Sequence, residues 1–376
     1  MPRVFKIVPT TQKYDWGKIG LSSKVAQYAA AAKIPGFTLD EKAPYAELWM
    51  GTHPNGPSLV AGSDTTLAEY LAAHPELMGS KVVSRFRDAG AEEGNLPFLF
   101  KVLAIEKALS IQTHPDKKTA EALHNEKPNI YKGASCDSNA NHKPEMALAL
   151  TPFTAMCGFL PLSQIAGYLV STLELAALIP KPITTQFLSA ASSADSSSPE
   201  AKTALKDLFS ALMTADEATF KARLADLVKR YEAGGATERE EGVKDLVLRL
   251  NSQFPGDIGV FCAFVLNYVK MQPGEAIFLA AGEPHAYVSG ALYDPPIPEF
   301  SVLQVLVPGG QTEAHPPIEG PSIAIVTEGK GTLESAGEKL EVAEGDVVFI
   351  GAVTGVKLVA AEEGQLAIYR AFVEAS

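Results

Sequence analysis

Short apolar stretches alternate with Gly, Pro and Asn turns over roughly the first 155 residues of the chain. Three such stretches are AELWMGTHPNGPSLV (46–60), PFLFKVLAIEKALSIQTH (97–114) and EMALALTPFTAMCGF (145–159). Their composition and turn signals are typical of β-strands. One helix is expected within TLAEYLAAHPELM, where Leu67 and Leu71 share a helical face. This part is therefore predicted to be mainly β.

The hydrophobic period changes after Pro161. Apolar residues then recur at helical spacing in three runs: Ile165, Leu169, Leu173 and Ala177; Leu205, Leu208, Phe209 and Leu212; Phe220, Leu224, Leu227, Val228 and Tyr231. A polar, low-complexity loop ends at Ser198, which is followed by Pro199 and Glu200. A hydroxyl, a proline and an acid in this order favour a helix start. Residues 160–252 are predicted to be a helical insertion.

Strands return from Gly259, and they contain an internal repeat. PGEAIFLAAGEPH (273–285) resembles EGDVVFIGAVTGV (344–356) at a constant offset of 71 residues. Such a repeat predicts two related jelly-roll units of the cupin type. His285 in the first copy corresponds to Val356 in the second, so only the first copy can bind a metal there.

These patterns define the expected organisation: a mainly β chain with two cupin-type jelly-roll units and an α-helical insertion. The expected parts are an N-terminal catalytic portion (1–159), the helical insertion (160–252), the rest of the catalytic unit (253–292) and a C-terminal unit without a metal site (293–376).

Composition narrows the possible partners. A net charge of −12 argues against nucleic acids and anionic membranes as partners. No apolar run is long enough to span a bilayer, and the N-terminus lacks the apolar core of a signal peptide. Three scattered cysteines imply no disulfide framework, which favours a reducing, cytoplasmic location.

Four residues are candidate metal ligands. Gln112 and His114 share one face of an extended chain, because side chains alternate with a period of two. Glu145 and His285 lie in other apolar β-stretches, where an unpaired polar group is costly. The alternatives are a surface strand end at which Gln112 and His114 are solvated, a solvated Glu145, a competing ligand at His142, and a turn role for His285.

The chemistry of this set suits a divalent ion. Two neutral imidazoles, a carboxylate and an amide oxygen leave a net charge of about +1 on the site. Such an ion polarises hydroxyl and carbonyl oxygens and stabilises an enediolate. Nitrogen and oxygen ligands suit zinc, and iron and manganese remain open by ligand type.

Several long blocks carry a family resemblance: QKYDWGKIG (12–20), YAELWMGTHPNGPS (45–58), LPFLFKVLAIEKALSIQTHPDKKTAEALH (96–124), NHKPEMALALTPFTAMCGF (141–159), GEAIFLAAGEPHAYVSG (274–290), YDPPIPEFSVL (293–303) and GPSIAIVTEGKG (320–331). In these blocks the chain resembles type I mannose-6-phosphate isomerases, the zinc-dependent phosphomannose isomerases. The blocks are spread over nearly the whole chain.

The resemblance implies one zinc ion held by Gln112, His114, Glu145 and His285. It places six further residues around a sugar phosphate: Trp16, Glu47, Lys101, Ser110, Lys143 and Tyr287. The implied reaction interconverts mannose 6-phosphate and fructose 6-phosphate through an enediol(ate), which supplies mannose for GDP-mannose and glycan synthesis. A monomer is expected. The remaining histidines are expected to be structural or at the surface: His53, His74, His124, His142 and His315.

The resemblance breaks after Gly290. Family members continue with a segment that contains an ECMA-type strand, a DNVVRAG-type loop and a TPK tail, whereas here Ala291 and Leu292 lead directly into YDPPIPEF. The absent segment would carry an acid, an arginine and a lysine of the site. The candidate catalytic bases that remain are Glu283, Glu47 and a water on the metal.

Two alternatives have a different function. Loss of the segment could leave a zinc-bearing sugar-phosphate-binding protein without turnover. Two histidines and a carboxylate on a cupin also describe an Fe(II) oxygenase, although Gln112 would fill a further position.

Overall fold

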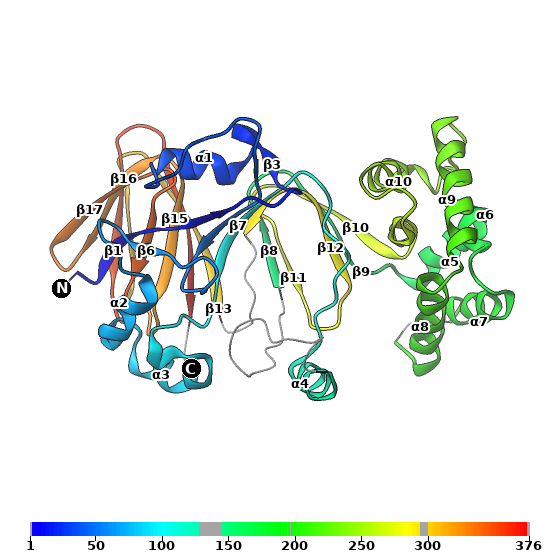
Figure 1. Cartoon of the computed structure of the whole chain (residues 1–376), viewed down its shortest axis with the longest axis horizontal. Helices are drawn as coiled ribbons and strands as arrows, with labels where there is room; N and C mark the ends of the chain where they lie inside the picture. Colours follow the sequence, from blue (N-terminus) through cyan, green and yellow to red (C-terminus); the bar gives the residue numbers. More distant parts are fainter. Residues whose placement is uncertain (1, 128–144, 194, 196, 294–299, 374–376) are drawn as a thin grey trace.

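The structure is a computed structural model that describes residues 2–127, 145–193, 195, 197–293 and 300–373. Figure 1 shows three parts in a row: a C-terminal β unit that also contains the N-terminal strand, a central β unit, and a set of helices at the far side. The mainly β architecture with a helical insertion is confirmed, because antiparallel strands form both β units.

The central unit is an antiparallel sheet in the order β10-β9-β12-β7-β5-β2, with β8 paired to β11 and β12. Its strands are β2 (Thr10–Gln12), β5 (Glu47–Met50), β7 (Phe100–Ile105), β8 (Glu145–Ala149), β9 (Phe153–Phe159), β10 (Leu266–Met271), β11 (Ala276–Leu279) and β12 (His285–Tyr293). The small ribbon of β3 (Lys18–Ile19) and β4 (Pro44–Tyr45) lies beside it. An apolar cluster that includes Leu103, Phe153 and Leu292 fills this unit.

The C-terminal unit consists of two sheets. One has the order β13-β20-β15-β18-β1-β6 and the other β14-β19-β16-β17. Their strands are β1 (Val4–Val8), β6 (Leu59–Val60), β13 (Phe300–Pro308), β14 (Thr312–His315), β15 (Ser322–Glu328), β16 (Lys330–Ser335), β17 (Glu338–Ala343), β18 (Val347–Ile350), β19 (Val356–Ala360) and β20 (Gln365–Val373). Strands β1 and β6 therefore tie the start of the chain to its end.

The predicted repeat is visible as matching strands. The first residues of β11 and β18 are 71 positions apart in the chain, and so are their last residues. The first residues of β12 and β19, His285 and Val356, are also 71 positions apart. Strands β11 and β18 each follow a Gly-acid turn, at Gly274 and at Gly345. The structure thus confirms that the 71-residue offset relates two similar β units.

The helices fall into two groups. Those around the β units are α1 (Lys24–Ala31), α2 (Leu67–Ala73), α3 (Ser80–Arg85) and α4 (Lys117–Glu126); those of the insertion are α5 (Leu162–Ser171), α6 (Leu173–Ala176), α7 (Lys181–Ala191), α8 (Pro199–Met213), α9 (Glu217–Glu232) and α10 (Glu241–Gln253). The predicted start of α8 is confirmed, because the Ser198 hydroxyl accepts from the backbone N–H of Ala201. Among the described helices, none is long and apolar enough to cross a membrane.

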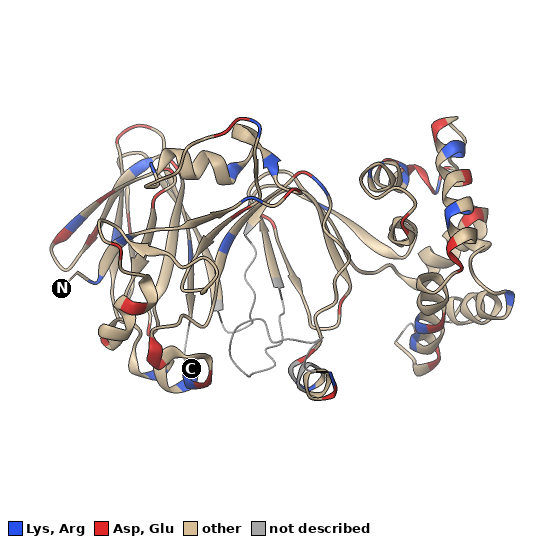
Figure 2. Cartoon of the chain, viewed as in Figure 1, with Lys and Arg blue, Asp and Glu red and all other residues tan. Residues whose placement is uncertain are grey.

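A buried ion-pair network holds the insertion together. Arg230 on α9 contacts both carboxylate oxygens of Glu174 and both of Glu240, at 2.8–2.9 Å. The Thr172 hydroxyl donates to Glu240 as well. Burial alone would raise the pKa of Glu240, but these hydrogen bonds and that from the Thr237 N–H outweigh it and lower the pKa to about 2. Figure 2 shows the outer residues of α9 as interleaved acids and bases, as expected of a solvated face.

Candidate metal and sugar-phosphate site

Gln112 and His285 form the backbone link that organises the site. The N–H of each donates to the carbonyl of the other at 2.8 Å, and the two residues form an isolated antiparallel bridge. The expectation that Gln112 and His114 continue a regular strand is wrong, because β7 ends at Ile105. They lie instead in an extended segment, held also by a 2.7 Å hydrogen bond from the Gly282 N–H to the His114 carbonyl.

Two imidazoles meet at this link. The ring centroids of His114 and His285 are 5.5 Å apart, and the Nε2 atoms of both rings are buried. His285 Nδ1 lies 3.0 Å from the carbonyl oxygen of Glu283. A proton on Nδ1 would satisfy that carbonyl and leave the Nε2 lone pair for a metal, which is a common second contact of ligating histidines.

The other proposed ligand, Glu145, is described for its backbone only. It is the first residue of β8 and stands opposite Leu279 of β11 in the antiparallel register. The side chain of Glu145 lies outside the described part of the structure, as do Lys143 and the competing ligand His142. Over the described residues, no group of three His, Cys, Asp or Glu side chains forms a metal-type cluster.

A buried ion pair lies on neighbouring strands of the same unit. Lys101 Nζ is 3.8 Å from Glu47 Oε2, and the two side chains are only 12% and 10% exposed. Trp49 Nε1 also donates a hydrogen bond to the Glu47 carboxylate. Glu47 stands opposite Leu103 on β7, two residues from Lys101. Because side chains alternate along strands, both charges face the side on which Leu103 joins the apolar interior.

Tyr14 and Trp16 stack beside this pair, with ring centroids 5.7 Å apart. Partial burial and, after it, the negative charge of Glu47 raise the pKa of Tyr14, whereas Lys101 lowers it. The electrostatic contact places Tyr14 close to both charges. Trp16 is a predicted substrate residue, whereas Tyr14 is not; the i, i+2 aromatic spacing in KYDWG is the sequence signal that points to both.

The remaining candidates differ in burial. Tyr287 is 3% exposed, and its ring lies 5.9 Å from that of His285 and 5.6 Å from that of Phe153. Ser110 is exposed in the segment after β7, and Glu283 is exposed in the turn before β12. Tyr287 thus lies between the imidazole pair and the apolar interior. Ser110 and Glu283 lie at the solvent-exposed edge of the candidate site.

Strand β12 runs without interruption from His285 to Tyr293 and so includes Gly290. Gly290 pairs with Ile105, and Tyr293 pairs with Val102. Residues 291–293 thus pair directly with β7, the strand that carries Lys101. The central sheet is therefore continuous across Gly290.

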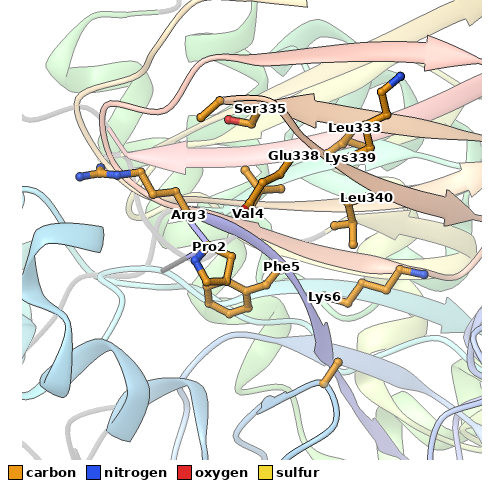
Figure 3. Close-up of a pocket in the computed structure, with 12 residues that line it drawn as sticks. Pro2, Arg3, Val4, Phe5, Lys6, Leu333, Ser335, Glu338, Lys339 and Leu340 are labelled. Atoms are coloured by element: carbon orange, nitrogen blue, oxygen red, sulfur yellow. The ribbon is translucent and has the colours of Figure 1, made fainter.

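A separate groove of about 830 Å³ lies between β1 and the β16–β17 hairpin (Figure 3). Val4, Leu333 and Leu340 form its apolar middle, and Arg3 and Lys6 extend away from it. Lys6 is paired with Asp346 at 2.8 Å. None of the candidate site residues lines this groove, so we assign it no role in the candidate site.

Fold and site together define a class: a two-unit jelly-roll protein with a helical insertion and, at one end of the first unit, a pair of imidazoles whose Nε2 atoms are buried. Family models of phosphomannose isomerase type I match the catalytic domain at residues 4–162, the helical insertion domain at 178–266 and the C-terminal region at 291–337. The chain belongs to the type I phosphomannose isomerase family, whose members are isomerases.

Individual relatives agree with this assignment. Curated mannose-6-phosphate isomerases are 41% identical in Cryptococcus neoformans, over 100% of both chains, and 36% identical in Saccharomyces cerevisiae, over 99% of both. A crystal structure of mannose 6-phosphate isomerase from Salmonella typhimurium bound to substrate and a zinc atom has a TM-score of 0.77. The two sequences are 24% identical, and the superposition covers 99% of this chain and 100% of the Salmonella chain.

Proposed function

We propose that the chain is a zinc-dependent aldose–ketose isomerase that interconverts mannose 6-phosphate and fructose 6-phosphate. The observation that carries this proposal is the convergence of Gln112, His114 and His285 at one backbone bridge. It occurs in a chain whose whole length aligns with curated isomerases of that substrate.

The residues present fit a zinc ion. His114 and His285 offer buried Nε2 atoms, Gln112 is joined to His285 through its backbone, and Glu145 is proposed as the carboxylate ligand. When bound at these residues, one zinc per chain would supply Lewis-acid polarisation of the sugar oxygens. Glu283 orients His285 through its carbonyl, which keeps Nε2 available as a ligand atom.

Charged and aromatic side chains near the metal residues are proposed to hold the sugar phosphate. Lys101 and Lys143 would attract the phosphate, and Ser110 would donate a hydrogen bond to it. Trp16 would cover one side of the sugar, as its stacking with Tyr14 allows. Tyr287 would limit the depth of the site, since it packs on the apolar interior.

Glu47 is the base that we favour for proton transfer between C1 and C2. Its carboxylate is buried, accepts from Trp49 and lies beside Lys101, so that it is held in a defined position near the substrate residues. Glu283 is exposed, which makes it the weaker candidate. Lys101 would balance the negative charge of the Glu47 carboxylate before it accepts the proton.

We further propose that this chain lacks an internal segment after Gly290. The alignment with the Cryptococcus relative extends over 444 residues, 68 more than the length of the chain. The uninterrupted course of β12 beyond Gly290 is compatible with such a loss. Loss of this segment also favours the second candidate function, a sugar-phosphate-binding protein that holds zinc but does not convert its ligand.

The cellular setting proposed for the chain follows from this chemistry. We place it in the cytoplasm as a monomer that supplies mannose for GDP-mannose synthesis. Cys157 and Cys262 are both buried, and the scattered cysteines of the sequence imply no disulfide framework, as suits a reducing compartment.

A coupled assay of the purified chain tests the activity. Mannose 6-phosphate should be converted to fructose 6-phosphate and the reverse, whereas glucose 6-phosphate, which differs at C2, serves as the control substrate. Calorimetric binding of fructose 6-phosphate without any conversion would instead support the binding protein. Neither binding nor conversion by the folded, zinc-loaded chain would refute both.

A further inference from the structure

Arg370 places a cation inside the C-terminal jelly roll. It is 3% exposed and lies on β20, on the same side as Leu366 and Ile368 of the apolar cluster. Its Nε donates to the Ser322 hydroxyl at 2.9 Å. Its Nη1 is buried and has no hydrogen-bond partner among the residues that the structure describes. A guanidinium in such surroundings is costly unless a counter-charge accompanies it.

A small cavity lies next to this guanidinium. Arg370 and His315 supply its polar wall, and aliphatic residues such as Val356 and Leu358 supply the rest. The centre of a water-sized sphere can occupy about 10 Å³ there, which is room for one small particle. The Nε2 of His315 is buried as well and lies 3.3 Å from the carboxylate of Glu313.

The cavity occupies the place in the second β unit that the proposed metal site occupies in the first. By the 71-residue offset, Val356 stands where His285 stands. His315 is the antiparallel partner of Val356, just as Gln112 is the partner of His285. In the second unit a polar residue, His315, thus stands opposite Val356, the position that corresponds to the proposed ligand His285. The positive charge at this place comes from Arg370.

Arg370 remains charged at neutral pH. Burial lowers its pKa to about 10, which is still well above 7. Burial also lowers the pKa of His315, and the nearby charge of Arg370 lowers it further, whereas Glu313 raises it. The permanent charge that faces the cavity is therefore positive.

We propose that this cavity binds a single small anion of the halide class, chloride in the cell, held by Arg370 beside His315. The volume excludes a phosphate or a carboxylate, because only one particle of about water size fits. A water molecule would accept from Nη1 but would leave the charge unbalanced, and the aliphatic wall offers it few further partners. The anion supplies both the acceptor and the counter-charge.

Bromide locates the site directly. Crystals of the full chain grown in sodium bromide should show a bromine anomalous peak beside Arg370 Nη1, inside the C-terminal jelly roll. Bromide sites on the protein surface serve as the positive control in the same map. Density without anomalous signal in the cavity, beside clear surface bromides, would identify water and overturn the proposal.

Thermal unfolding tests the same site in solution. At constant ionic strength, replacing gluconate by chloride should raise the unfolding midpoint of the full chain by about 2–4 °C in a saturable way. The Arg370→Met variant should lose this response, and Arg3→Met, which removes an exposed arginine of the same unit, should keep it. Equal midpoints of the wild-type chain in both salts would contradict chloride binding, and this readout does not depend on isomerase activity.

Discussion

Gln112 and His285 exchange both of their backbone hydrogen bonds, although 173 positions separate them in the chain. The exchange fixes the segment after β7 against the start of β12, so that His114 and His285 are brought together by main-chain contacts. The imidazole pair is therefore preorganised by the fold.

Removal of one imidazole should abolish metal binding. The His285→Ala chain is expected to lose most of the roughly one zinc per chain, with an affinity at least ~100-fold lower, because the donor set loses a nitrogen ligand. Zinc content after gel filtration measures this. His74→Ala, at a half-buried histidine that pairs with the exposed Glu76, is the control and should keep its zinc. Wild-type zinc content in His285→Ala would refute the assignment.

Variants of the Glu47–Lys101 pair should distinguish its effect on stability from its effect on activity. Lys101→Met leaves the Glu47 carboxylate buried beside an apolar side chain, which should cost about 3 kcal/mol of unfolding free energy. The double variant Glu47→Gln, Lys101→Met removes both charges and should regain most of that stability.

Activity should remain lost in the double variant, because both the base and the phosphate contact are absent. Urea unfolding and the coupled assay, run on the same three proteins, measure the two effects. Full activity in the double variant would exclude Glu47 as the base.

Gly290 should be intolerant of a side chain. Its φ is +109°, and an added Cβ would lie 2.6 Å from the Pro152 carbonyl oxygen and 2.8 Å from the Phe153 Cα. Gly282 has a similar φ of +86° but open space around it. Gly282→Ala should therefore cost only backbone strain, and Gly290→Ala should cost roughly 1–3 kcal/mol more. Equal losses in urea unfolding would show that β12 is not packed against Phe153 in solution.

The period of the hydrophobic residues and the 71-residue internal repeat made much of this fold predictable. Helical spacing marks the insertion because its helices bury one apolar face, as Leu208 and Leu212 do on α8. The 71-residue offset predicts the paired β units because a Gly-acid turn and an alternating strand recur in both.

Contacts across strands were not predictable in the same way. The Glu47–Lys101 ion pair depends on the β5–β7 register, which hydrophobic alternation alone leaves undetermined. The strand expected through His114 ends at Ile105, because the following segment contacts β12 through separate backbone hydrogen bonds, such as those at Leu109 and Gln112, and not through a regular ladder. His315 was expected to be structural or at the surface, and its place beside Arg370 emerges only when β14 pairs with β19.

The helical insertion should lose stability in acid through Glu240. Its pKa is about 2 in the folded chain against an ordinary value of 4.5, so the unfolded chain takes up the proton first. The stabilisation is present above pH 4.5 and is lost as the pH falls from there through 2.

Glu240→Gln should lower the unfolding free energy at pH 7 by roughly 2 kcal/mol and flatten its dependence between pH 5 and pH 2. Glu241→Gln, at an exposed neighbour, is the control. Helix ellipticity during urea unfolding at several pH values measures both variants, and an unchanged slope in Glu240→Gln would contradict the network.

Turnover and zinc content, measured on one sample before chelation, after chelation and after zinc is restored, test the central claim most directly. We predict that interconversion of mannose 6-phosphate and fructose 6-phosphate disappears with the chelated metal and returns with about one zinc per chain. Stoichiometric zinc without turnover in the folded chain would contradict it, and would mean that the fold and metal site remain while catalysis has been lost.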